Sequence, residues 1–108
     1  MPVVERCEDF LEFATALAEQ LPGAEILDSR FRAKTDQLSV KIQWQGEPIE
    51  MSITGIEGTD TPSWMPLFIT AEIDCPERIE EQVNAAALAA FGGRNLVREV
   101  FVNGAEVK

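Results

Sequence analysis

The chain opens with a helical pattern of apolar residues. Between Glu5 and Leu21 these residues recur three or four positions apart, the spacing that places side chains on one face of an α-helix. The residues on this face are Phe10, Phe13, Ala14, Leu17 and Leu21. Pro22 and Gly23 follow. Because proline cannot continue the hydrogen bonds of a helix, we expect the helix to end there.

Three segments with alternating apolar and polar residues come next. Ala24–Ala33 places Leu27, Phe31 and Ala33 on one face, opposite Asp28, Arg30 and Arg32. Leu38–Trp44 and Ile49–Thr54 alternate more regularly. A period of two residues is typical of a β-strand that buries one face. Short turns are expected at Lys34–Gln37 and Gln45–Glu47, so the three segments predict an antiparallel meander with one solvent-exposed face.

The second half of the chain predicts a strand, a helix and a final strand. Alternation resumes over Leu67–Ile73 and returns over Leu96–Val102, where Asn103-Gly104 is a strong signal for a hairpin turn. Helical spacing lies between these strands, at Ile79, Val83, Ala86, Ala87 and Ala90. We expect this helix to be capped by Asp74 or Cys75, to have Pro76 at its first position and to end at Gly92-Gly93.

The element order is therefore α-β-β-β-β-α-β. With 108 residues the chain has room for a single domain, so we expect one α+β domain over residues 1–108. We expect an antiparallel sheet of about five strands with both helices packed on one face. In size, acidity and the order of a helix followed by a meander, the chain is similar to the small secretion chaperones that bind effector proteins. Those chaperones usually close with a helix, whereas this chain closes with a strand.

The charge balance limits the partners. Nineteen acidic residues against nine basic ones give a formal charge of −10, which repels phosphate backbones and attracts basic proteins. The same charge also serves solubility. The longest apolar run, Ala85–Phe91, is too short to span a bilayer, and acidic residues near the N-terminus are unlike a signal peptide. We expect a cytoplasmic protein that binds neither nucleic acid nor membranes.

The residue types also limit the chemistry. Histidine and tyrosine are absent, which removes the commonest general base and the commonest metal ligand. Cys7 and Cys75 are the two thiols and are expected to be reduced. Carboxylate pairs such as Glu80 with Glu81 match no metal-binding or glycosidase pattern and are interpreted as surface charge. We therefore expect no enzymatic activity, no metal and no cofactor. The alternative is an accessory subunit or small enzyme that uses a carboxylate with a bound cofactor.

The candidate partner-binding residues lie in a long aperiodic loop, Gly55–Pro66, and on the first helix. Large apolar side chains in or beside this loop either fold back as a plug or face a partner, and both alternatives remain open. Acidic residues on the helix would meet a basic surface. The predicted binding residues are Ile56, Trp64, Met65, Phe68, Glu8 and Glu12. The expected function is a small acidic protein-binding module: a chaperone or adaptor, or an inhibitor or immunity-type protein that occupies a basic surface of its partner.

Two further features have more than one interpretation. Arg30, Arg32 and Lys34 form a basic cluster that could protect an edge strand from aggregation or bind an anion. Leu96–Val102 is apolar on both faces, with Val97 and Phe101 opposite Leu96, Val100 and Val102. An edge strand of this kind can pair across a two-fold axis, so a homodimer is possible.

Overall fold

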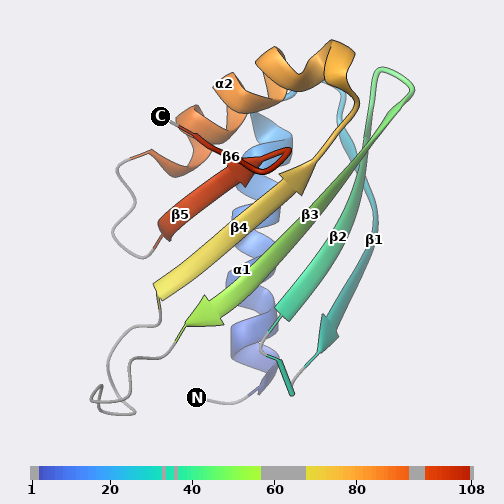
Figure 1. The fold of residues 1–108 in the computed structure, drawn as a ribbon. Helices are drawn as coiled ribbons and strands as arrows, with labels where there is room; N and C mark the ends of the chain where they lie inside the picture. Colours follow the sequence, from blue (N-terminus) through green and yellow to red (C-terminus); the bar gives the residue numbers. More distant parts are fainter. Residues whose placement is uncertain (1–2, 33, 36, 57–67, 93–96, 108) are drawn as a thin grey trace.

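A computed structural model describes residues 3–32, 34–35, 37–56, 68–92 and 97–107, and for residues 3–9, 56, 68, 97 and 98 it describes the backbone only. Two helices, one short 3-10 helix and six strands make up this part of the chain (Figure 1). Their bounds are α1 (Val3–Glu19), β1 (Glu25–Arg32), β2 (Gln37–Trp44), β3 (Glu47–Ile56), β4 (Phe68–Asp74), η1 (Glu77–Ile79), α2 (Glu80–Phe91), β5 (Val97–Val102) and β6 (Ala105–Glu106).

The strands form one sheet in chain order, β1 to β6, and the predicted α+β class is confirmed. Two details differ from the expectation. First, β4 and β5 are parallel, because α2 carries the chain back to the starting end of β4 before β5 begins. Second, the Asn103-Gly104 turn closes a short sixth strand, with φ values of 51° and 82° that suit a two-residue hairpin turn.

Both helices pack on the same face of the sheet, behind the strands as drawn in Figure 1. The rings of Phe13 in α1 and Phe91 in α2 lie 6.3 Å apart, and Phe10 meets Phe31 of β1 edge to face at 6.0 Å. In the strands, the buried residues on this side are Leu38, Val40, Ile42, Trp44, Ile49, Met51, Ile53, Ile69, Ala71, Ile73, Val100 and Val102. No polar or charged residue is buried in the described part of the chain, so the core is held by apolar contact.

The predicted buried stripes of both helices are confirmed, since every residue assigned to them is buried. The predicted start of the second helix is wrong. Pro76 precedes the 3-10 turn in an extended conformation, and no side chain caps that turn or α2. Asp74 is instead the last residue of β4, paired with Glu50, and the backbone N–H of Cys75 donates to Asn103. The helix ends at Phe91, where Gly92 follows as expected.

The predicted face of Leu27 is also wrong. The β1–β2 register shifts between Ile26 and Asp28, which makes Leu27 the extra residue of a β-bulge. Ile26 therefore pairs with Ile42 and contacts the core, whereas Leu27 is 57% exposed. Phe31, further along the strand, keeps its predicted place against the core.

Candidate functional site

The face of the sheet opposite the helices is the main candidate for binding. No described element covers it, and we call it the open face (Figure 1). Its side chains alternate with the buried ones and are mostly polar or charged. Among the side chains that the structure describes, two large apolar ones lie on this face. Leu27 protrudes at the β1 bulge, and Phe101 of β5 is half-buried.

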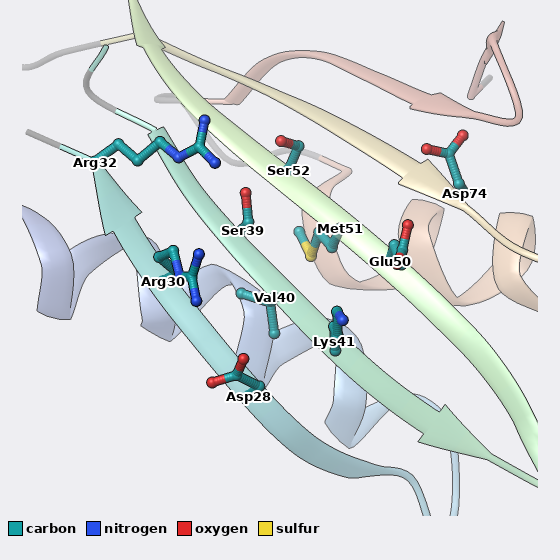
Figure 2. Close-up of a pocket in the computed structure, with 10 residues that line it drawn as sticks. All are labelled: Asp28, Arg30, Arg32, Ser39, Val40, Lys41, Glu50, Met51, Ser52 and Asp74. Atoms are coloured by element: carbon teal, nitrogen blue, oxygen red, sulfur yellow. The ribbon is translucent and has the colours of Figure 1, made fainter. Parts of the chain in front are cut away.

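The described residues of the open face border at least three shallow grooves. One, of about 280 Å³, is bordered by Glu72, Asp74 and Phe101. A second, of about 340 Å³, includes Leu27 and Pro48. The third, of about 350 Å³, extends from the arginines of β1 across to β4 and is shown in Figure 2. The grooves on the open face are thus shallow, and the charged side chains that border them are exposed.

The β4–β6 side of the open face is acidic, and we call it the acidic half. Phe101 lies between two glutamates in the strand ladders, paired with Glu72 of β4 and with Glu106 of β6. Asp74 borders the same groove, and Glu99 precedes Phe101 by two residues. All four carboxylates are exposed, and none has an ion-pair partner among the described residues. One aromatic ring therefore lies within a group of free carboxylates.

The β1 side of the open face carries cations. Arg30 and Arg32 of β1 pair with Ser39 and Gln37 of β2, respectively. Figure 2 shows both arginines on the same face of the sheet as Ser39. Within the described residues neither guanidinium has a carboxylate partner within 4 Å. The β1 side of the open face therefore carries exposed charges of both signs, since Glu25 and Asp28 of the same strand pair with Gln43 and Lys41. The described charged residues of the acidic half, by contrast, are carboxylates.

The structure brings together two of the predicted binding residues. Ile56 and Phe68 are directly paired at the end of the β3–β4 ladder. Trp64 and Met65 lie outside the described residues, so the choice between plug and interface for Trp64 stays a prediction.

The two predicted acidic residues lie elsewhere. Glu12 is exposed on α1, on the helix side of the sheet. Glu8 lies in the same helix, but its side chain is outside the described part of the chain. These positions do not form one surface with the open face.

Sequence reasoning missed Phe101 and Leu27 as parts of the candidate surface. The apolar second face of β5 did give a signal for Phe101, but it was assigned to a homodimer edge. In the structure, β6 pairs with β5 at Phe101 and Val102, and Val107 donates its N–H to the carbonyl of Val100. The edge available for the predicted dimer is therefore limited to residues 97–99. Leu27 had no separate signal, because a bulge shifts the alternation by one residue.

Cys75 is the half-buried thiol that the sequence placed near a helix start. Burial raises its pKa, a hydrogen bond from Asn103 lowers it, and the nearby carboxylates of Glu80 and Asp74 raise it further, for a net rise. A raised pKa disfavours the thiolate, which is the nucleophilic form. Among the described residues, no group of three or more carboxylate, cysteine or histidine side chains is arranged to hold a metal ion.

Comparison with protein-family models, curated proteins and solved structures gives no match. The layout shared with secretion chaperones therefore remains a likeness of element order. Within the described residues, neither helix has the length and apolar character needed to cross a membrane. What the protein does must be inferred from the geometry of this chain.

Proposed function

We propose that the protein is a non-enzymatic binding module, and that the acidic half of its open face holds a basic surface of a partner protein. The position of Phe101 carries this proposal. Its half-buried ring is flanked by Glu72 and Glu106 and borders a groove with Asp74. A ring surrounded by free carboxylates matches the chemistry of an arginine or lysine side chain.

Such a side chain gains from both kinds of group. Its cationic head is attracted to the face of an aromatic ring, by about 0.5–1 kcal/mol at an exposed site. Its aliphatic stem covers apolar surface, while carboxylates on either side accept hydrogen bonds from the head. Arginine is favoured, because its planar guanidinium both stacks on a ring and binds a carboxylate through two N–H groups. The net charge of −10 adds long-range attraction toward a basic partner.

The chaperone or adaptor role and the inhibitor or immunity role share this requirement for a basic partner, and both belong to the proposal. So does a cytoplasmic setting. The alternative, an accessory subunit or small enzyme with a carboxylate and a bound cofactor, calls for a pocket that shields its reacting groups from water. The carboxylates that border the described grooves are exposed, which favours the binding role.

The test measures binding of a short arginine-rich peptide and of the partner captured from the native host. We expect Phe101→Ala to weaken both by about tenfold or more, as for an aromatic anchor, and Glu72→Gln to weaken them less. Glu19→Gln makes the same charge change on exposed α1 and should leave affinity within about twofold. A Glu12→Gln variant tests whether α1 contributes.

The proposal fails if folded Phe101→Ala binds as tightly as the original chain. It also fails if Glu19→Gln weakens binding as much as Glu72→Gln, since diffuse charge and not the Phe101 groove would then hold the partner. The melting temperature of each variant shows whether a loss of affinity reflects unfolding.

A further inference from the structure

The two arginines of β1 pair across the ladder with the uncharged residues Ser39 and Gln37, while Asp28, Glu50 and Asp74 also line the groove that the arginines border. Across the sheet from β1 to β3, Arg30 pairs with Ser39, which pairs with Ser52. Arg32 pairs with Gln37, which pairs with Thr54. Lys41, by contrast, lies between Asp28 and Glu50, which offset its charge. A pair of guanidinium groups without carboxylates opposite them is unexpected in a chain with a net charge of −10.

Two serine hydroxyls line the same groove as these guanidinium groups. Gln37 donates from Nε2 to the Oγ of Ser52 over 2.7 Å. Because that oxygen already accepts a hydrogen bond, the hydroxyl proton of Ser52 is free to point into the groove. Ser39 is exposed beside it, opposite Arg30, and its hydroxyl has no hydrogen-bond partner among the described residues.

We propose that Arg30 and Arg32, with the hydroxyls of Ser39 and Ser52, bind the phosphate group of a phosphomonoester. Alternate residues of a strand are about 6–7 Å apart, so two guanidinium groups on one face of β1 can reach oxygens of a single phosphate. Two positive charges balance its dianion, and the planar N–H fork of each arginine matches two phosphate oxygens. In this arrangement the serine hydroxyls donate to the phosphate oxygens that face the sheet. Figure 2 shows Ser39 and Ser52 among the residues that line the groove.

Protection of an edge strand does not account for this arrangement. That role needs only charge on β1, which lysine supplies equally well, and it makes no use of hydroxyls on β2 and β3. The four residues of the site are not among those that line the Phe101 groove, although Asp74 borders both grooves, and the site does not depend on the proposed function. A small phosphorylated molecule and a phosphorylated side chain present the same group.

The experiment is an NMR titration of the isotope-labelled chain with O-phosphoserine, followed at the amides of Ser39 and Ser52 and at the arginine Nε–H signals. The phosphate of O-phosphoserine, with a second pKa near 6, loses a proton between about pH 5 and about pH 7, and the chain has no histidine that could change its charge over the same range. We expect affinity for O-phosphoserine to rise several-fold over this range as the dianion forms. Inorganic sulfate is a dianion over this whole range, so it should bind with the same affinity at about pH 5 and at about pH 7.

The variants separate a shaped site from general charge. Arg30→Gln and Arg32→Gln should each weaken binding by about tenfold, and Arg30→Lys should weaken it measurably because the fork is lost. Lys34→Gln removes the same charge from the exposed turn that follows β1 and should stay within about twofold.

The inference is overturned if the shifts do not centre on Ser39 and Ser52, or if Lys34→Gln acts as strongly as Arg30→Gln. Acetate that binds as tightly as O-phosphoserine also overturns it, since the site would then recognise any carboxylate. A phosphoserine peptide identifies the source. Much tighter binding of the peptide indicates a phosphorylated partner segment, whereas equal binding indicates a small molecule, and both agree with the site.

Discussion

Asn103 connects the β5–β6 turn to the end of β4, because its side-chain oxygen accepts a hydrogen bond from the backbone N–H of Cys75 at 2.9 Å. Its own backbone N–H donates to the carbonyl of Ile73 at 2.8 Å, and its side-chain Nδ2 donates to Cys75 Sγ at 3.7 Å. Asn103 also has φ +51°, a conformation that asparagine tolerates better than most residues. One residue thus forms the turn and fixes it beside the groove of Phe101.

Two substitutions separate the contributions that the side-chain hydrogen bonds of Asn103 and its backbone conformation make to stability. Asn103→Gly keeps the positive φ without strain but loses the side-chain hydrogen bonds, so we expect a loss of about 1 kcal/mol in the free energy of unfolding. Asn103→Ala loses the same bonds and strains the turn, for a total of about 2–3 kcal/mol. Urea unfolding measures both. An Asn103→Gly variant as stable as the original chain would show that these hydrogen bonds contribute nothing.

The raised pKa of Cys75 predicts a loss of stability at alkaline pH. The folded chain keeps the thiol proton at pH values where the unfolded thiol, with a pKa near 8.5, has released it. Because the folded state then binds more protons than the unfolded state, the free energy of unfolding decreases as the pH rises above about 8.5. Below about pH 8.5 the stabilisation that the protonated Cys75 thiol provides is fully present.

The measurement compares urea unfolding of the original chain and of Cys75→Ala at about pH 7.5 and about pH 9.5. Tyrosine is absent, so no phenol contributes to the pH dependence in this range. Cys7 is present in both proteins, so its effect on stability cancels in the comparison. We expect the original chain to lose more stability than Cys75→Ala, and equal losses would contradict the assignment.

The bulge in β1 predicts opposite results for two adjacent apolar residues. Ile26 contacts the core and pairs with Ile42, so Ile26→Ala should lower the free energy of unfolding by about 1–2 kcal/mol. Leu27 is exposed, so Leu27→Ala should change it by less than about 0.5 kcal/mol. Thermal unfolding of the two variants checks the register directly. The reverse order would mean that β1 pairs without a bulge.

The same two residues show where sequence patterns stop predicting this fold. Periodicity correctly assigned both helices and the strands around Val40 and Met51, because burial on one face imposes a strict spacing there. It failed at Leu27, since a single extra residue reverses the alternation without any change in composition. The parallel pairing of β4 with β5 was also missed, because strand direction depends on where a connecting helix delivers the chain.

The candidate sites were less predictable for a related reason. Alternation tells which residues share a face of a strand, but the register between strands decides which side chains become neighbours. Phe101 meets Glu72 and Glu106 only through such pairing. The hydroxyl of Ser52, likewise, comes near the arginines of β1 only through β2, which lies between them. The sequence identified the basic cluster around Arg30 but contained no signal for the serines beside it.

Trp64 gives the last prediction, in which stability and affinity are measured on one variant. If its indole is an anchor for the partner, Trp64→Ala should weaken binding by about 2 kcal/mol or more and leave the melting temperature unchanged. If it plugs the core, the same variant should lose about 3–5 kcal/mol in the free energy of unfolding, and binding should fall only through unfolding.

Trp44→Phe is the matched control for this measurement. Its indole is buried and donates from Nε1 to the carbonyl of Pro22 at 3.0 Å, so it joins the end of β2 to the segment after α1. Removing that hydrogen bond should lower stability by about 1 kcal/mol and leave the affinity of the folded fraction unchanged. A Trp64→Ala variant that behaves like Trp44→Phe, with lost stability and intact affinity, would exclude Trp64 from the interface. Phe101 would then be the aromatic anchor still proposed for the partner.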